Sequence, residues 1–234
     1  MTRFIAIASG KGGTGKTTTA INLGVTLNNQ GLKVIVVDGN ISQPNVSLYL
    51  GFPQDLHGLT DVLTGTKNIT DTIYLHPSGL GLIPSNGSVR ISGDISVGLG
   101  SAMLNLVGKA DVVIIDIGAG HGAEVQSVLK SADETLIVTN PDHASINEAI
   151  RTSELAEELG SVVLGVVINK VTGNKQDIPP SKIKSMINKP IIGIIPEDKN
   201  VREALSMKNP VVYTHPESSA SIEFKKIAEL LQND

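Results

Sequence analysis

The sequence contains no cysteine. This absence excludes disulfides, thiolate metal sites, iron–sulfur clusters and cysteine nucleophiles. No stretch reaches the roughly 18 to 20 uninterrupted apolar residues that span a bilayer, so we expect any membrane contact to be peripheral. Positive charge is not in excess, because 19 Lys and Arg residues stand against 23 Asp and Glu residues. Tight electrostatic binding to nucleic acid or to anionic lipid is therefore not predicted.

The chain begins Met1-Thr2-Arg3-Phe4-Ile5-Ala6 and runs directly into a short apolar pattern. It has neither the longer apolar region nor the small-residue cleavage site of a secretory signal, and we expect a cytoplasmic protein. The 234 residues, of which 40% are hydrophobic, suit one large α/β domain over residues 1–234 better than two small domains. We interpret the Gly and Ser residues of 78–101 as loops between elements and not as an interdomain linker.

Short, nearly continuous apolar runs alternate with segments of helical spacing. Such runs are typical of strands buried on both faces. The expected strands are Phe4–Ala8, Val34–Val37, Val112–Ile115, Leu136–Val138, Val162–Ile168 and Ile191–Ile195. The expected helices include Thr17–Asn29, Ala123–Ser131, Ala144–Leu159 and Pro180–Ile187. This alternation predicts an α/β fold with a doubly wound, mostly parallel sheet flanked by helices, in which ligands bind beyond the carboxyl ends of the strands.

A complete phosphate-binding loop pattern follows the first expected strand and opens the first expected helix. It reads Gly10-Lys11-Gly12-Gly13-Thr14-Gly15-Lys16-Thr17. Glycines let the backbone wrap around phosphates with its N–H groups pointing inward, and the helix presents its positive end to the same anion. We expect Lys16 to neutralise β- and γ-phosphate charge, Thr17 to ligate Mg²⁺, and Thr18 to donate to an α-phosphate oxygen. The alternative is an ordinary glycine-rich turn.

Two aspartates follow expected strands, Asp38 in Asp-Gly-Asn and Asp116 in Asp-Ile-Gly-Ala-Gly. An Asp after an apolar strand near a phosphate-binding loop usually holds magnesium and its waters, directly or through one water. We therefore predict Asp116, and after it Asp38, as metal ligands beside Thr17. The alternative for each is a turn-forming or helix-capping role.

With Lys11 after its first glycine, the loop resembles the deviant Walker A form found in the MinD/ParA family of P-loop NTPases. The resemblance covers nearly the whole chain, and the matching segments stand in the family's order. They are Gly10–Thr18, Asp38–Gly51, Asp116–Gly120, Thr139–Pro141, Asn169–Lys170 and Ile195–Asp198. The chain is most similar to the MinD branch and its relative that controls flagellar number, where a Gly-Ala-Gly ending of the Asp116 motif is also seen.

The resemblance implies an ATPase whose two subunits clasp ATP face to face. Lys11 of each subunit would reach the phosphates bound by its partner, as an arginine finger does, so that ATP controls homodimerisation and hydrolysis reverses it. The alternative for Lys11 is a solvated loop lysine. The implied catalytic residues are Lys11, Lys16, Asn40 and Asp116, and the implied cofactors are ATP or ADP with Mg²⁺. The implied output is the positioning of a regulatory or cargo protein.

The resemblance also implies contacts to the adenine base. Asn169 ends a buried run where the family usually contacts adenine, and Pro196, Glu197 and Asp198 occupy the loop that closes over the base. Asn-Lys after a strand is a short match, and an amide that satisfies a local turn is the alternative for Asn169.

The sequence departs from the family at Asn40, where a second acidic residue is usual. That carboxylate is implied to orient the attacking water, and an amide keeps its shape but loses its charge. Either Asn40 makes the protein a slow ATPase that still binds ATP, or the change was engineered to trap the ATP-bound state.

A second departure is at the C-terminus, where the MinD branch often adds an amphipathic helix that folds onto the membrane. The stretch Ser221–Leu231 mixes acidic and basic residues and lacks a strongly basic polar face. We therefore expect this last helix to pack on the core, which leaves membrane recruitment in doubt.

Three functions remain in competition. The first is a MinD-like spatial regulator that hydrolyses ATP slowly, and the second is an ATP-gated dimerising scaffold with negligible hydrolysis, which Asn40 favours. The third is a ParA-like partition ATPase, which the acidic balance of charge and the absent N-terminal DNA-binding extension disfavour.

The histidines show no metal-ligand spacing, and we expect them in loops or on the surface. They are His57, His76, His121, His143 and His215. His121 follows the Asp116 motif directly and is the one candidate sensor of the nucleotide state.

Overall fold

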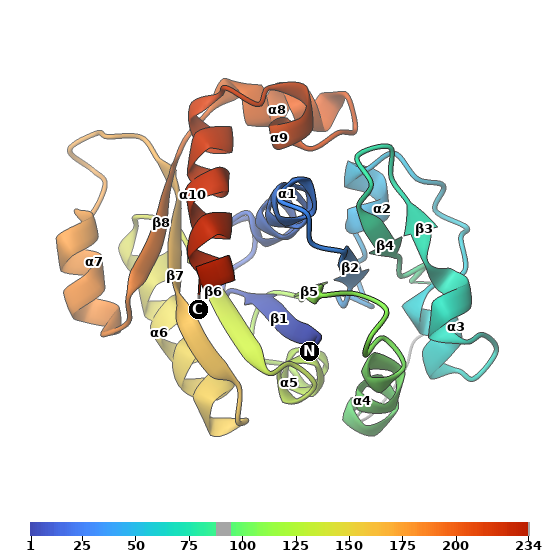
Figure 1. Cartoon of the computed structure of the whole chain (residues 1–234). Helices are drawn as coiled ribbons and strands as arrows, with labels where there is room; N and C mark the ends of the chain where they lie inside the picture. Colours follow the sequence, from blue (N-terminus) through green and yellow to red (C-terminus); the bar gives the residue numbers. More distant parts are fainter. Residues whose placement is uncertain (88–94, 234) are drawn as a thin grey trace.

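In the computed structural model, which describes residues 1–87 and 95–233, one eight-stranded sheet runs through the molecule (Figure 1). Its strand order is β3-β4-β2-β5-β1-β6-β7-β8. The strands are β1 Arg3–Ala8, β2 Val34–Asp38, β3 Tyr74–Leu75, β4 Gly81–Ile83, β5 Val112–Asp116, β6 Glu134–Thr139, β7 Val162–Val171 and β8 Ile191–Pro196. All neighbours pair in parallel except β3 and β4, which are antiparallel. The prediction of a mostly parallel, doubly wound sheet is confirmed.

Helices cover both faces of the sheet (Figure 1). The helices are α1 Lys16–Asn29, α2 Val46–Tyr49, α3 Leu59–Leu63, the 3-10 helix η1 Ile69–Thr72, α4 Ser96–Leu104, α5 Ala123–Lys130, α6 His143–Glu158, α7 Pro180–Ile187, α8 Lys199–Ser206, α9 Val211–Thr214 and α10 Ser219–Asn233. Side chains alternate across a strand, so β1 contributes to both cores. Ile5 and Ile7 pack with α1 and α10, whereas Ala6 and Ala8 pack with α4, α5 and α6. This burial on both faces explains the continuous apolar runs.

The last helix, α10, packs on the core as expected. Phe224, Ile227 and Leu231 are buried on its inner face, and each such burial contributes about 1.5 to 3 kcal/mol. Ile222 and Leu230 remain exposed on its outer face. The apolar positions of this helix are therefore used mainly for folding.

The interpretation of 78–101 as loops is wrong in part. Strand β4 extends the sheet beside β2, and α4 packs on it through Leu99, Ala102 and Met103. Long-range burial of these apolar side chains outweighs the local preference of Gly and Ser for turns. Residues 88–94 lie outside the described residues.

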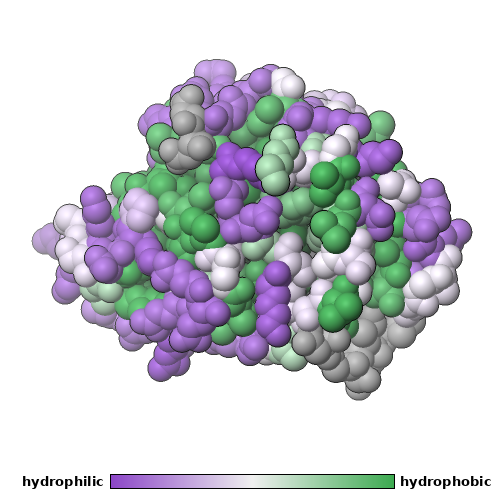
Figure 2. Space-filling view, turned by 60° about the horizontal axis from the view of Figure 1, so that its bottom comes forward, coloured by the Kyte–Doolittle hydropathy of each residue, from purple (hydrophilic) through white to green (hydrophobic). Residues whose placement is uncertain are grey.

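The molecule presents a mixed surface on the side of α4, α5 and α6, where apolar patches lie between polar side chains (Figure 2). Over the described ranges 1–87 and 95–233, no helix combines the length and the apolar character that crossing a bilayer requires. His76 lies in the loop between β3 and β4, where its side chain is buried, its Nδ1 lies 2.9 Å from Ser78 Oγ, and its ring contacts Phe52 and Tyr213.

Candidate functional site

The phosphate-loop pattern forms the turn between β1 and α1. Gly13 and Gly15 adopt left-handed backbone conformations, with φ of 77° and 102°. A Cβ atom on Gly15 would lie 2.1 Å from Asn169 Nδ2, so this position needs glycine for space as well as for conformation. The tight turn places the N-terminus of α1 directly beyond β1, where its free N–H groups suit an anion.

Lys16 stands at the start of α1 with its ammonium largely removed from water. Its Nζ donates to Ser9 Oγ at 2.9 Å, and the Ser9 hydroxyl donates to Lys11 O at 2.8 Å. Burial lowers the pKa of Lys16, and the nearby carboxylate of Asp116 partly offsets this effect. A buried ammonium held by a single hydroxyl is suited to receive an anionic ligand.

Asp116, at the end of β5, is a buried acidic residue of the site with an incomplete set of hydrogen bonds. Thr17 Oγ1 donates to its Oδ2 at 2.6 Å, whereas its buried Oδ1 has no hydrogen-bond partner in the described part of the chain. Burial raises the pKa of Asp116 to about 6, against the opposing effects of the Thr17 hydroxyl and the Lys16 charge. A buried carboxylate oxygen without a partner beside a threonine hydroxyl fits a hard cation such as Mg²⁺.

Asp38 lies beside Asp116 because β2 and β5 pair in parallel with these two residues in register. Its Oδ1 accepts from Asn40 N at 3.2 Å, and its Oδ2 accepts from Asn45 N and Val46 N, both at 2.9 Å. Burial and the neighbouring charge of Asp116 raise the pKa of Asp38 well above its usual range, although these hydrogen bonds oppose the rise. The carboxylate therefore fixes the start of α2, and its contact with a metal stays a prediction.

Asn40 connects the loops that follow β2 and β5. Its Nδ2 donates to Gln43 O at 2.6 Å, and its Oδ1 lies so close to Gly118 that a Cβ there would be 3.2 Å away. The amide side chain thus stabilises its own loop, which a carboxylate could not do through the same donor.

A cavity of about 700 Å³ opens beside these residues, within the size range of small-molecule sites. The predicted site residues that line it are Gly12, Gly13, Gly15, Lys16, Thr17, Thr18, Asn40, Asn169, Pro196, Glu197 and Asp198. Gly10, Lys11, Thr14, Asp38 and Asp116 are not among its lining residues. Asp38 and Asp116 are buried next to the lining residues Asn40 and Thr17, to which they are hydrogen-bonded.

Residues at the end of β7 hold the phosphate loop from the side. Asn169 Nδ2 donates to Thr14 O and Lys170 Nζ donates to Gly13 O, both at 2.7 Å. Lys170 has a left-handed backbone, with φ of 57°, where the pairing of β7 with β8 changes register. Sequence reasoning missed the role of Lys170, and the contact of Asn169 with adenine stays a prediction.

The far end of the cavity is formed by the β8–α8 segment. Glu197 forms an ion pair with Arg202 at 2.6 Å. Asp198 caps α8 by accepting from Asn200 N at 2.8 Å, and also accepts from Ser219 Oγ of α10 at 2.8 Å. Further lining residues that sequence reasoning missed are Val201, Arg202, Leu205 and Phe224. The helical spacing after Pro196 is the signal that predicts such an apolar face.

Lys11 lies outside the cavity and contacts α6. Its Nζ is 3.4 Å from Asp142 Oδ1, and both side chains are 46% exposed. Asp142 also caps α6 by accepting from Ser145 N at 2.9 Å. An exposed pair of this kind contributes at most about 1 kcal/mol, so Lys11 is free to exchange this partner for another. Its action across a dimer stays a prediction.

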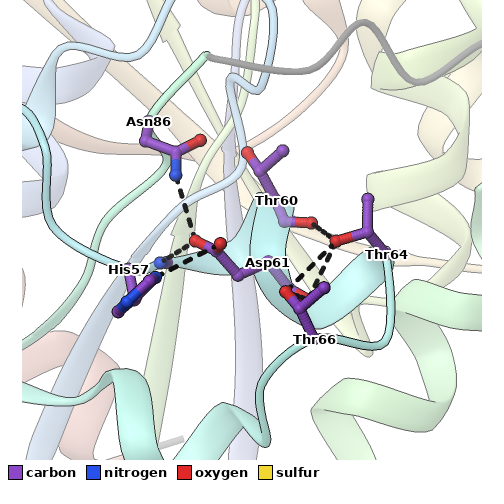
Figure 3. Close-up of polar contacts among 7 residues, drawn as sticks. His57, Thr60, Asp61, Thr64, Thr66 and Asn86 are labelled. Atoms are coloured by element: carbon purple, nitrogen blue, oxygen red, sulfur yellow. Dashed lines mark hydrogen bonds and ion pairs between the residues drawn. The ribbon is translucent and has the colours of Figure 1, made fainter.

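A separate polar cluster surrounds Asp61, in α3 (Figure 3). Its Oδ2 accepts from Gly58 N at 2.8 Å and from Asn86 Nδ2 at 3.0 Å, and His57 Nδ1 lies 3.3 Å from Oδ1. Thr64 and Thr66 donate to the carbonyl oxygen of Asp61. None of these residues lines the cavity, and their polar groups bond one another.

Comparison with known proteins places this arrangement in a family. The family model described as "ParA: NUBPL iron-transfer P-loop NTPase" matches residues 1–232. An uncharacterized ATP-binding protein of Methanocaldococcus jannaschii is 36% identical over 97% of this chain and 86% of its own length. The septum site-determining protein MinD of Synechocystis is 30% identical over 99% of this chain and 90% of its own length.

A solved structure of MinD from Pyrococcus horikoshii in complex with Mg-ADP has a TM-score of 0.90 and 33% identity. The match covers 99% of this chain and 96% of that one. Together these matches bear out the resemblance drawn from the sequence: the chain belongs to the MinD/ParA family of P-loop NTPases, in its MinD-like branch.

Proposed function

We propose that the protein is an ATPase that binds Mg-nucleotide in the cavity beyond β1, dimerises on ATP, and positions another protein or complex. The observation that carries the proposal is the buried Oδ1 of Asp116, which has no partner among residues 1–87 and 95–233 and lies beside the Thr17 hydroxyl and the Lys16 ammonium. An anion site at Lys16, which lines the cavity, and a cation site directly behind Thr17 match the two halves of a Mg-nucleotide.

Thr17 and Asp116 would hold the metal, with Asp38 behind them. The cation would supply Lewis-acid stabilisation of charge on the transferring phosphoryl group. Lys16 and the N–H groups of the loop would bind the phosphates, Thr18 would reach the α-phosphate, and the β8–α8 segment would contact the base. The Mg-ADP bound to the MinD of Pyrococcus horikoshii supports this assignment.

Dimerisation through Lys11 would complete the site. The contact of Lys11 with Asp142 leaves its ammonium exposed, and a weak surface pair is readily exchanged for a phosphate of a facing subunit. A cation supplied in trans would stabilise the transition state of phosphoryl transfer. ATP would then join two subunits, and hydrolysis would release them. The name of the Synechocystis relative, septum site-determining, supports a spatial role.

Asn40 favours a second candidate, an ATP-gated scaffold with negligible hydrolysis. Its amide is bonded to Gln43 O and provides no carboxylate to orient an attacking water. We propose slow ATP hydrolysis as the first hypothesis. An ATP-dependent dimer without ATP turnover would favour the scaffold. No iron-transfer role is proposed, because a chain without cysteine has no thiolate to hold a cluster.

Membrane recruitment through α10 is not part of the proposal, because its apolar residues Phe224, Ile227 and Leu231 are buried in the core. A sedimentation assay with anionic liposomes and ATP checks this point. We expect the protein to stay in the supernatant, and robust binding to bare liposomes would contradict the expectation.

The proposal is tested by measuring ATP turnover against protein concentration, with dimerisation followed by light scattering in the same samples. We expect cooperative turnover and an ATP-dependent dimer, both lost in Lys11→Ala. Lys175→Ala, which removes an exposed lysine from the loop after β7, is the matched control and should behave as the wild type. A monomer that hydrolyses ATP at a rate independent of concentration would contradict the shared site.

A further inference from the structure

Two segments of the site meet at one residue of α6, Glu148. The first is the start of the phosphate loop, because a Cβ atom on Gly10 would lie 2.7 Å from Glu148 Cβ and 2.8 Å from its carbonyl oxygen. The second is the loop after Asp116, because His121 Nδ1 lies 3.9 Å from Glu148 Oε2. Arg151, one turn further along α6, also donates to Glu148 Oε1 at 3.1 Å.

His121 also contacts Thr152 of α6, and the surrounding hydrogen bonds show which of the two residues is the donor. Thr152 Oγ1 donates to Glu148 O at 2.7 Å, and His121 Nε2 lies 3.0 Å from the same Oγ1. A hydroxyl has one proton to donate, so Thr152 accepts here and His121 Nε2–H donates. The imidazole therefore directs one nitrogen at Thr152 and the other at the Glu148 carboxylate.

The loop between Asp116 and Ala123 is held from two helices. His121 reaches α6, and Gln126 Nε2 of α5 donates to the His121 carbonyl oxygen at 2.9 Å. The sequence of the loop is Ile117-Gly118-Ala119-Gly120-His121-Gly122, with one polar side chain among three glycines. Gly118, Ala119 and Gly122 line the cavity, and Gly120 N donates to Ser9 O at 3.4 Å. A glycine-rich loop costs little to move, so its position depends strongly on its anchors, and His121 is the anchor that reaches α6.

Helix α6 also reaches Lys11. Its N-terminal cap, Asp142, pairs with Lys11 Nζ at 3.4 Å, while Glu148 and Thr152 lie further along the same 16-residue helix. A helix of this length behaves as one rigid element. A displacement of the loop after Asp116 that moves His121 would therefore also shift the residue that holds Lys11.

We propose that His121 is a positioning residue that couples the loop after Asp116 to α6, so that nucleotide binding at the cavity is transmitted to the Lys11–Asp142 contact. The proposal deepens, and rests on, the proposed nucleotide-dependent function. It makes α6 the two-state element that His121 contacts on the side of the cavity and that Lys11 contacts at its N-terminal cap.

The test follows backbone amide hydrogen exchange of α6 in the wild type and in His121→Ala, without nucleotide, with Mg-ADP and with a non-hydrolysable Mg-ATP analogue. We expect nucleotide to change the protection of α6 in the wild type and not in His121→Ala. His121→Gln keeps an N–H donor in place of Nε2, and we expect it to restore part of the response. Arg151 donates to Glu148 from within α6. We therefore expect α6 of Arg151→Ala, the control variant, to respond to nucleotide as the wild type does.

Kinetics provide a second readout. We expect His121→Ala to lower kcat for ATP about ten-fold, as lost positioning does, with KM and the Kd for Mg-ADP within about two-fold of the wild type. The effects of His121→Ala and Thr152→Val should be non-additive, because the two residues share one hydrogen bond. If His121→Ala lowered kcat, the affinity for Mg-ADP and Tm together, His121 would have a purely structural role, and the proposal would be overturned.

The test separates this proposal from the proposed function. A wild type without ATP turnover whose α6 still responds to nucleotide contradicts the ATPase and supports the coupling. A wild type that hydrolyses ATP while α6 protection stays unchanged by nucleotide overturns the coupling alone.

Discussion

Asp116 and Asp61 are two carboxylates of one chain in opposite situations. Asp61 accepts from Gly58 N and Asn86 Nδ2 and has His57 nearby, so both of its oxygens have partners (Figure 3). Asp116 is buried, has a raised pKa and keeps one oxygen without a partner in the described part of the chain. A folded protein seldom leaves a buried carboxylate oxygen unpaired without a functional reason. The comparison indicates that Asp61 serves the fold and that Asp116 serves a ligand.

The largest expected effect is that of Lys16→Ala on nucleotide affinity. The Lys16 ammonium is held in the cavity by one hydroxyl and is placed for phosphate, so Lys16→Ala should weaken Mg-ATP binding at least about 100-fold. Fluorescence titration with a labelled nucleotide measures this loss, and Lys175→Ala controls for the change in net charge. Wild-type affinity in Lys16→Ala would remove the anion half of the proposed site.

Asp116→Asn should stabilise the nucleotide-free protein. Because the folded-state pKa of about 6 lies above the usual 3.8, the folded protein binds more protons than the unfolded chain between these values. The Asp116 carboxylate therefore destabilises the fold increasingly as pH rises through this window. Asn removes this cost, and we expect the free energy of unfolding to rise by about 3 kcal/mol at pH 8 and to match the wild type below pH 4.

Urea unfolding at pH 4 and pH 8 measures this difference. The exposed Asp55→Asn, which removes a carboxylate from the surface, should show no such pH-dependent gain. A destabilised Asp116→Asn at pH 8 would contradict the view that Asp116 is held at a cost to stability.

Asp61→Ala should do the reverse of Asp116→Asn. It removes the acceptor for Gly58 N and Asn86 Nδ2, and we expect a loss of about 1 to 2 kcal/mol in the free energy of unfolding. Calorimetry on the same preparation should give unchanged Mg-ADP affinity, since the cluster does not line the cavity. Weakened nucleotide binding would break the contrast between the two carboxylates, and Asp55→Ala serves as the control.

Asn40→Asp should produce the smallest change, a rise in steady-state ATP turnover of about ten-fold. This ten-fold increase is smaller than the usual contribution of a general base to the rate. An Asp at position 40 loses the hydrogen bond that Asn40 donates to Gln43 O, and its negative charge would face that carbonyl oxygen. A coupled phosphate-release assay measures the rate. Unchanged turnover would show that position 40 does not limit hydrolysis.

Local patterns predicted the parts of the molecule that depend on local physics. The phosphate loop, the long strands and the helix α6 follow from glycine spacing and apolar periodicity, and the register of β2 with β5 brings Asp38 beside Asp116 as expected for parallel neighbours. Strand β4 and helix α4 were missed because their stability comes from burial against distant residues.

Contacts between residues far apart in the chain were also missed. Lys170 reaches Gly13 O across 157 positions, and Glu148 supports Gly10 from α6. The apolar rows of α8 and α10 that line the cavity are visible in the sequence, but which side faces a ligand depends on how the helices dock.

The central claim is that Oδ1 of Asp116, to which no described residue donates, marks a cation site that completes nucleotide binding. Isothermal titration of ADP into the wild type and into Asp116→Asn, each with Mg²⁺ and with a chelator, tests it most directly. We predict that Mg²⁺ tightens ADP binding at least about ten-fold in the wild type and has little effect in Asp116→Asn. An equal effect of Mg²⁺ on the two proteins would contradict the claim.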